Sequence, residues 1–545
     1  METKKEYAAG GSPVTNESTL ESAPSVQYGE IEQIGSTHRG LKSRHIQLIA
    51  IGGAIGTGLF IGSGAILANS GPAPLLMAYI VMSMFIWIVM QDVGEMTAWM
   101  PVRGVTIPYM VKKFVDPSLA FATGWNYWFS SGLTPGAEAT AAALLFEYWT
   151  TAVPSAVWIT IVHGVILALN LGAVRYFGEA EFWFASIKIL AITGLIIMGF
   201  VLMLGGGPNH DRSGFRYWND PGAFHEYLVT GQTGNFLAFW YALIKAGFAF
   251  IGSPESITNT AGECQAPRRN IPKAARRFIY RLLVFYMLGA FVIGMLVPWT
   301  DPHLLGSSSS AASPFVIAIK NAKISGLDDI VNFALITSAW SAGNSALYSG
   351  SRMLYGIARQ GLAPRIFQKC NRLGVPYYAV IITWVIGLLA FLNVSSNGAN
   401  VFGWISDIIT VSGIVNWVVV LFTYTRFRKA TFFHGIRHRL PFKSLLQPYT
   451  TWFTMFVISL MTLTNGFYNF FPGKWSTANF VTSYVAILIF AVLYAGHKIK
   501  HKGPLCLKIK EIDLVSGLEE VEEITANDIP PVPKNFAQKL WYWIC

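Results

Sequence analysis

Charged side chains are scarce in this sequence: Asp, Glu, Lys and Arg together make up 13% of its 545 residues. A soluble chain carries about a quarter charged residues, so the composition disfavours a soluble globular protein. Cysteine is scarcer still, with four residues and no metal-ligand spacing, so neither a disulfide framework nor a metal site is expected. The histidines form no zinc or triad pattern, and the absence of GxxxxGK[ST] argues against an ATP-driven pump.

Hydrophobic residues, in contrast, make up 53% of the chain and aromatic residues 14%. They gather in runs that approach or exceed the roughly 20 residues that one helix needs to cross a bilayer. The runs predict an all-α polytopic membrane protein with transmembrane spans at about 45–69, 73–98, 118–147, 156–174, 182–205, 236–258, 277–299, 328–351, 377–395, 401–424, 451–471 and 479–497, twelve in number. The net charge of +11 lies mostly in short connectors, so it indicates membrane topology and not nucleic acid binding.

The connectors also predict orientation. Gaps after even-numbered spans carry clusters of Lys and Arg, so these gaps and both tails are expected to be cytoplasmic. The N-terminal tail, 1–44, lacks the apolar core of a signal peptide and has a composition typical of disorder. Lys4 and Lys5 in this tail are candidate acceptors for ubiquitin ligase machinery. The C-terminal tail, 501–545, ends in Cys545, a possible palmitoylation site.

Glycines break the first apolar run at its centre, where His45 to Gly64 reads HIQLIAIGGAIGTGLFIGSG. Each glycine weakens a helix by about 1 kcal/mol relative to alanine, and transporters use such breaks to expose backbone groups to a ligand at the membrane midplane. A second break, KAGFAFIGSPE, interrupts the sixth run, because the proline of Gly252-Ser253-Pro254 costs a helix about 3 kcal/mol. The alternative function of these glycines is close helix packing.

Spans one and six are five apart and cross the membrane in opposite directions. This arrangement predicts a five-plus-five inverted repeat over about 45–205 and 236–424, with discontinuous helices 1 and 6 and a binding site at the repeat interface. The last two spans, 451–497, are then accessory helices outside the repeat. The predicted transporter domain covers 45–500.

Several motifs in a fixed order carry a family resemblance: GGAIGTGLFIGSG, GEM, GWNYWF, FGEAEFW, FRYWNDPGAF, AGECQAPRRNIPKA and SAGNSALYSGSRMLYGIA. With them, the chain from about 38 to 500 resembles a fungal amino acid permease of the amino acid-polyamine-organocation superfamily, in the yeast amino acid transporter family. The stretch LIKAGFAFIGSPE followed by AGECQAPRRNIPKAARRF is most similar to the proline permease branch.

The resemblance implies a secondary active symporter that imports L-proline with a proton across the plasma membrane and needs no cofactor beyond the proton gradient. A general or other neutral amino acid permease stays an alternative, because GSPE departs from the AGTE-like pattern more common in the family. A further alternative is an amino acid-sensing receptor, which would be expected to carry a long structured cytoplasmic extension.

The needs of an amino acid identify candidate substrate-binding residues. Its carboxylate suits the free N–H groups where a half-helix begins, at 55–58. Its amino or imino group suits the carbonyls at the end of the broken sixth helix, 248–250. A pyrrolidine ring has no polar group, so Phe248 and apolar neighbours would recognise it by shape. The candidate set is Ile55, Gly56, Thr57, Gly58, Lys245, Phe248, Ala249, Phe250, Gly252 and Ser253.

Charges inside the spans are candidates for coupling or gating, since each costs about 2.5–3.5 kcal/mol at mid-helix. Lys188 resembles the lysine that replaces a sodium ion in proton-coupled relatives, and it could instead pin the first helix as a permanent charge. Glu138 and Lys245 lie at similar predicted depth and are expected to pair, for gating or for structure. Glu255 is expected to start the second half-helix or to contact the substrate's ammonium group.

Overall fold

The computed structural model describes residues 56–102, 105–172, 174–261, 266–305, 313–394, 398–526 and 535–536. Within these residues the regular secondary structure is entirely helical. Ile55, the N-terminal tail with Lys4 and Lys5, and Cys545 lie outside the described residues. Cys370 and Cys506 are free thiols.

Five described segments are long and apolar enough to cross a bilayer. They are α3 (Pro72–Trp99), Phe177–Met203 within α7 (Val174–Met203), Pro267–Leu296, Asn400–Phe433 within α15 (Gly398–Phe433), and α17 (Thr477–His501). The segment Pro267–Leu296 joins α10 (Pro267–Arg281), the π-helix η4 (Leu282–Met287) and α11 (Leu288–Leu296). An all-helical polytopic fold is therefore confirmed, while the twelve-span count and the inverted repeat stay predictions.

Other helices occupy the remaining apolar runs. The shorter apolar ones are η1 (Gly58–Gly62) with α2 (Ser63–Ser70), α6 (Ser155–Leu171), α14 (Tyr377–Gly387) with η7 (Leu388–Val394), and α16 (Tyr449–Leu463). The longest of the rest are α5 (Pro117–Phe146), α8 (Gly231–Ala246) and α13 (Leu327–Arg359). Short helices outside the predicted spans are α4 (Ile107–Phe114), α12 (Pro314–Asn321) and α18 (Glu519–Ala526).

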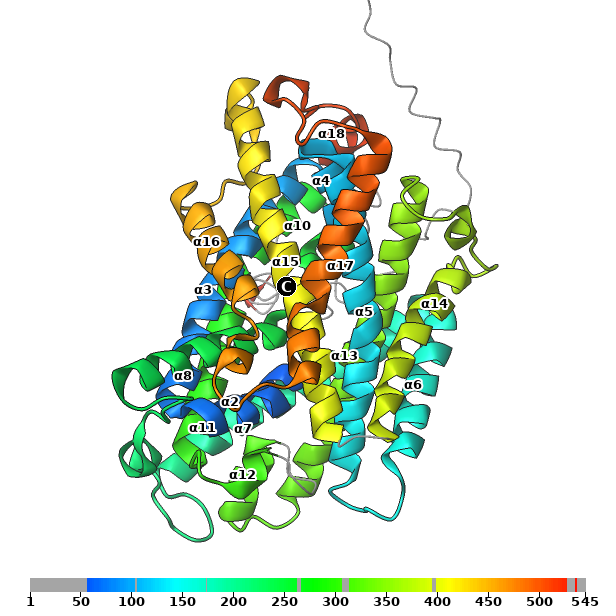
Figure 1. Ribbon diagram of the computed structural model, residues 1–545. Helices are drawn as coiled ribbons and strands as arrows, with labels where there is room; N and C mark the ends of the chain where they lie inside the picture. The colour runs from blue at the N-terminus through cyan, green and yellow to red at the C-terminus, as the bar shows by residue number, and fades with distance from the viewer. Residues whose placement is uncertain are drawn as a thin grey trace, which may run out of the picture. The chain divides into compact units, whose positions relative to one another are not determined.

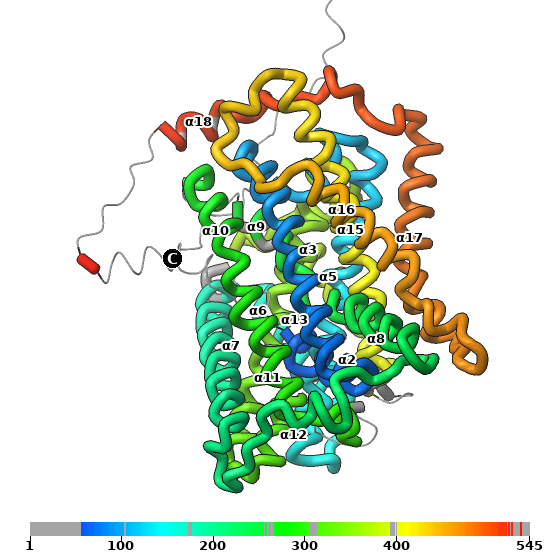
Figure 2. The backbone as a smooth tube through the Cα atoms, turned by 90° about the vertical axis from the view of Figure 1, so that its left-hand side faces the viewer, coloured from blue at the N-terminus to red at the C-terminus, as the bar shows by residue number. Residues whose placement is uncertain are grey.

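Helix α5 makes many of the contacts between helices and runs beside α13, α15 and α17 (Figure 1). Helix α5 also approaches α14 closely, because a Cβ added to Gly136 would lie 2.5 Å from the carbonyl oxygen of Gly387 in α14. Helix α3 packs against α8, α10 and α11 on the other side (Figure 2). Gly136 therefore lies where two helices approach closely, as small residues do in membrane helix interfaces.

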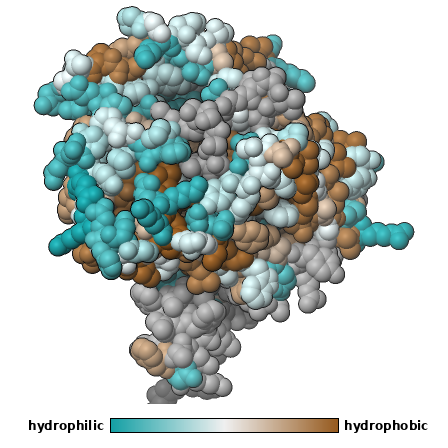
Figure 3. All heavy atoms as spheres, turned by 90° about the horizontal axis from the view of Figure 1, so that it is seen from below, coloured by the Kyte–Doolittle hydropathy of each residue, from teal (hydrophilic) through white to brown (hydrophobic). Residues whose placement is uncertain are grey.

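Burial separates interior helices from those facing the bilayer. The apolar segment of α15 is 78% buried, whereas that of α17 is 11% buried, so most of α17 faces outward. Viewed onto the end that carries α12, hydrophilic side chains gather on one side and hydrophobic ones toward the other (Figure 3). Outward apolar side chains on α17 are the expected contact with lipid chains.

Residues 505–526 form a C-terminal strap across the ends of α3 and α4 (Figure 2). The Trp99 indole donates to the carbonyl of Leu514 at 2.9 Å, and the Lys113 ammonium lies 3.3 Å from the Asp513 carboxylate. Apolar anchors of the strap are buried at Ile512, Leu514, Leu518 and Val521. The strap thus binds through both apolar contact and charge.

Replacing Asp513 by Ala should loosen the strap. Burial alone would raise the pKa of Asp513, but the N–H groups of Ser516 and Val515 and the charge of Lys113 lower it from 3.8 to about 2. Its contribution is therefore complete above about pH 3.8 and is lost as the pH falls toward about 2. Limited proteolysis at neutral pH should cut the strap faster in Asp513→Ala than in the exposed control Glu519→Ala. Equal rates would mean that the apolar anchors suffice.

Candidate functional site

The start of the first described helical segment contacts the turn that interrupts the sixth apolar run. Gly58 begins η1, and Ala249 lies in η3 (Gly247–Phe250), the 3-10 turn that ends α8. A Cβ added to Gly58 would lie 2.6 Å from the Cα of Ala249 and 2.9 Å from its nitrogen. Because both atoms belong to the backbone, no side-chain movement could relieve the clash. Only glycine at 58 therefore lets the start of η1 and the turn η3 approach this closely.

The start of the first helical segment is oriented by a neighbouring helix. The Thr57 hydroxyl donates to Glu138 Oε1 of α5 at 3.0 Å, and Thr57 is 1% exposed. A Cβ at Gly56 would lie 3.4 Å from the same carboxylate oxygen. The Thr57 side chain makes no capping bond to the backbone N–H groups of η1. Such groups suit an anion.

The second break changes the direction of the chain at a glycine. After η3, Gly252 adopts φ +83°, a left-handed conformation that favours glycine. Helix α9 (Glu255–Ala261) then begins, and Ser253, in the turn between them, is 1% exposed. Residues 252–254 thus divide the sixth apolar run into two helical pieces, as the sequence predicts.

The three predicted carbonyl acceptors each accept one hydrogen bond already. The Phe248 carbonyl accepts from the N–H of Ile251 at 3.3 Å, and the Phe250 carbonyl accepts from the N–H of Ser253 at 3.2 Å. The Ala249 carbonyl accepts from the Tyr286 hydroxyl at 3.0 Å. A carbonyl oxygen has two lone pairs, so each can accept one more bond.

The two phenylalanines of this turn differ in accessibility. Phe250 is fully buried and stacks on Tyr286 with ring centroids 4.5 Å apart, so its side chain belongs to the core. Phe248 is only partly buried and meets Phe402 of α15 edge to face at 5.8 Å. Phe248 is therefore the aromatic side chain of this turn that remains available to an apolar ligand.

A cluster of buried charged side chains lies next to Thr57, at the start of η1. Lys188 of α7 is fully buried, and the carboxylates of Glu138 and Glu181 both act on it electrostatically. Glu181 accepts from the Ser341 hydroxyl at 2.8 Å and from the Asn344 amide at 2.7 Å, which ties α7 to α13. The second oxygen of Glu138 has no hydrogen-bond partner among the described residues. The cluster thus links the Thr57 hydroxyl to Lys188 through Glu138.

Glu181 is a residue that sequence reasoning missed. It lies seven residues before Lys188, a spacing of two helical turns that places both side chains on the same face of α7. The motif FGEAEFW contains it, and its acidic side chain near the start of an apolar run was the available signal.

The predicted pairing of Lys245 with Glu138 is wrong. The Lys245 ammonium forms a salt bridge with Asp407 of α15 and lies near the rings of Tyr241 and Tyr468, with centroids at 5.8 Å and 5.4 Å. Similar depth could not reveal which helix faces Lys245, and α15 supplies the nearer carboxylate. Asp407 is the sole acidic residue of the run 401–424, so the sequence did contain this signal.

Glu255 begins α9, as predicted, and ties it to two other helices. Its Oε1 accepts from the Tyr127 hydroxyl of α5 at 2.9 Å and from the Trp417 indole of α15 at 3.2 Å. Its second oxygen is buried and has no partner among the described residues. These bonds give Glu255 a clear role in positioning the second half-helix.

Comparison with known proteins identifies the family of this chain. Residues 45–508 match the family model described as amino acid permease. The proline-specific permease of Emericella nidulans is 55% identical over 96% of this chain and 97% of its own length. A probable proline-specific permease of Schizosaccharomyces pombe is 48% identical over 90% of each chain, and the proline-specific permease of Saccharomyces cerevisiae is 48% identical over 92% of this chain and 82% of its own. This chain therefore belongs to the amino acid permease family, and is a multi-pass membrane protein that transports amino acids and not an enzyme.

Proposed function

We propose that this permease imports L-proline across the plasma membrane in symport with protons. The observation that carries the proposal is the contact of Gly58, at the start of η1, with Ala249 of η3, which sets helix-start N–H groups beside a turn of carbonyl acceptors. A zwitterion needs this combination of donors and acceptors. The similarity to three relatives named for proline supports the choice of substrate.

In this proposal the substrate carboxylate binds at Ile55, Gly56, Thr57 and Gly58, and the imino group meets the carbonyls of 248–250. Gly252 and Ser253 shape the turn. Phe248 contacts the pyrrolidine ring, and each ring methylene contributes about 0.8 kcal/mol when buried. Selectivity over other small neutral amino acids then depends on exclusion of bulk at Phe248.

Charged residues would couple binding to access. Lys188 exchanges a proton next to Glu138, because Glu138 acts on Lys188 electrostatically and also accepts from the Thr57 hydroxyl at the start of η1. The Lys245–Asp407 pair, between α8 and α15, acts as a gate, and Glu255 holds the second half-helix.

A twelve-helix, five-plus-five repeat with cytoplasmic termini would let the bundle of spans one and six rock against the rest. Ubiquitin ligases acting on Lys4 or Lys5 would control removal from the membrane.

Uptake of radiolabelled L-proline into cells without their own permeases tests the substrate. We expect saturable uptake that increases with external acidity and that unlabelled proline and close cyclic analogues block. Alanine, valine, lysine and glutamate should compete weakly. Block by a broad panel of amino acids would assign the chain to a general or other neutral amino acid permease instead.

A further inference from the structure

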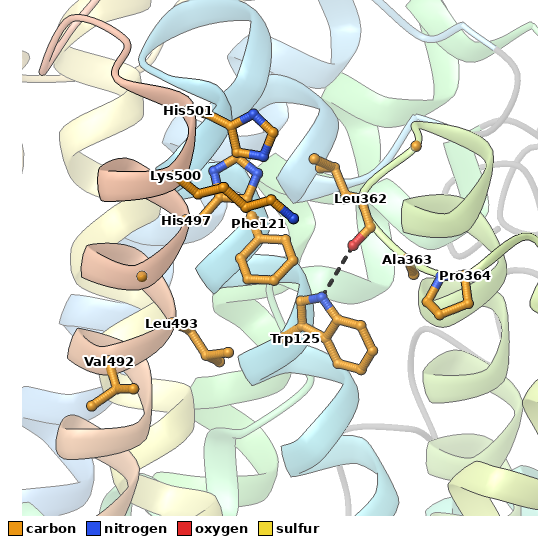
Figure 4. A pocket seen from close by; sticks show the side chains of 12 residues that line it. Phe121, Trp125, Leu362, Ala363, Pro364, Val492, Leu493, His497, Lys500 and His501 are labelled. Atoms are coloured by element: carbon orange, nitrogen blue, oxygen red, sulfur yellow. Dashed lines mark hydrogen bonds between the residues drawn. The ribbon is translucent and has the colours of Figure 1, made fainter.

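A pocket of about 490 Å³ lies between α5, α17 and the loop that follows α13 (Figure 4). Neither Gly58 nor Ala249 lines it. This volume falls in the usual range of about 300–1,000 Å³ for ligand sites. Phe121 and Trp125 of α5 form one wall, and Leu362 forms another. The Trp125 indole donates to the Leu362 carbonyl at 3.2 Å, which fixes the loop against α5.

The pocket is apolar along one part and lined by basic side chains along another. Leu493 lies next to the aromatic wall, whereas His497, Lys500 and His501 gather one to two turns later at the end of α17 (Figure 4). His497 stacks on Phe121 at 4.6 Å and on His501 at 4.2 Å. These contacts hold the imidazoles at the end of the apolar wall.

Lys500 remains available to a ligand. Lys498, two residues earlier, is engaged by Asp116 at 2.8 Å, but no carboxylate of the described residues forms a salt bridge with Lys500. The Lys500 ammonium points from α17 toward the Leu362 side of the pocket (Figure 4). A cation without an acidic partner, placed over an apolar wall, complements an anion that carries a hydrocarbon tail.

The surroundings identify the source of such an anion. Only 11% of the residues in the apolar segment of α17 are buried, and Val492 at the pocket is 61% exposed. The pocket therefore opens on the surface that faces lipid chains. The start of α5, the end of α17 and the loop after α13 all belong to the end that the connector charges place in the cytoplasm. The cytoplasmic leaflet is the one that contains anionic phospholipid.

We propose that the α5–α17 pocket binds an anionic glycerophospholipid of the cytoplasmic leaflet. The headgroup phosphate lies against Lys500 and His501, and one acyl chain follows Leu493 and Phe121. The proposal rests on the cytoplasmic placement of these ends and is independent of the transported substrate. The bound lipid joins the accessory helix α17 to α5 and to the loop after α13.

Native mass spectrometry of the full chain tests the proposal, after transfer from nanodiscs of phosphatidylcholine with phosphatidylserine. We expect the wild type to retain phosphatidylserine in preference to phosphatidylcholine. Lys500→Gln should weaken this retention about fivefold, the value of one basic group at an anionic surface. Lys500→Arg should restore it. Lys502→Gln, which removes an exposed lysine two residues away and outside the pocket, should leave retention unchanged.

Two further arms separate the lipid from other ligands. Leu493→Gln should weaken retention of phosphatidylserine, because the acyl chain loses its apolar contact. Soluble glycerophosphoserine should compete poorly. Equal loss in Lys500→Gln and Lys502→Gln, or equal retention of both lipids by the wild type, would overturn the proposal. Full competition by glycerophosphoserine would also overturn it, since the pocket would then bind a free phosphate ester.

Discussion

Replacement of Lys188 by Ala should abolish concentrative uptake of proline. Without the ammonium, the buried carboxylates of Glu138 and Glu181 lose the positive charge that acts on both, and removal of one partner from a buried ion pair costs about 3–5 kcal/mol. The amount at the cell surface must therefore be measured together with radiolabelled uptake. Loss of uptake at normal surface level would place Lys188 in the transport mechanism.

Lys188→Arg separates coupling from structure. Arginine keeps the positive charge but does not release its proton. If Lys188 were only a structural pin, the arginine variant would transport with normal pH dependence. If Lys188 exchanges the coupled proton, the variant should reach the surface and yet fail to accumulate proline against a gradient. Normal pH-dependent accumulation in Lys188→Arg would exclude it as the coupling group.

Replacement of Lys245 by Leu should reduce uptake to background while the protein still reaches the surface. The substitution leaves Asp407 of α15 without its salt-bridge partner from α8. Surface amount and uptake should be compared with Lys474→Leu, which removes an exposed lysine outside the site. Normal proline uptake by Lys245→Leu would remove this residue from the mechanism.

The double variant Lys245→Leu/Asp407→Leu decides why the pair matters. Replacing both members of a buried pair by apolar residues is often neutral for stability. A purely structural pair would therefore regain transport when both charges are removed. We expect the double variant to reach the surface, as Lys245→Leu does, and to remain inactive, because a gating pair must form and break during the cycle.

The sequence predicted the break at 252–255 well and the pairing of charges poorly. Glycine and proline act on their own stretch of backbone, so GSPE at 252–255 indicates an interruption without any knowledge of the neighbouring helices. A charge inside a helix is different, because its partner depends on which helix faces it. Lys245 was assigned to Glu138 by depth alone, and the rotation and neighbours of α8 select Asp407 instead.

Residues that serve through tertiary contacts were also missed. Glu181 gains its importance from Ser341 and Asn344, which lie about 160 residues later in the chain. The carbonyl of Ala249 accepts from Tyr286, a bond that no local pattern predicts. In contrast, Glu255 was expected to begin a helix from local sequence alone, and it does. Local signals thus indicated the start of α9, and the contacts between helices required the structure.

Proton-driven accumulation by the purified full chain in sealed liposomes tests the central claim most directly. With an imposed pH gradient, acidic outside, we expect labelled proline to accumulate above its external concentration, and a protonophore should collapse the accumulation. The same vesicles with a sodium gradient and no pH gradient should only equilibrate. Accumulation driven by sodium, or proline accumulation that survives the protonophore, would contradict proton symport.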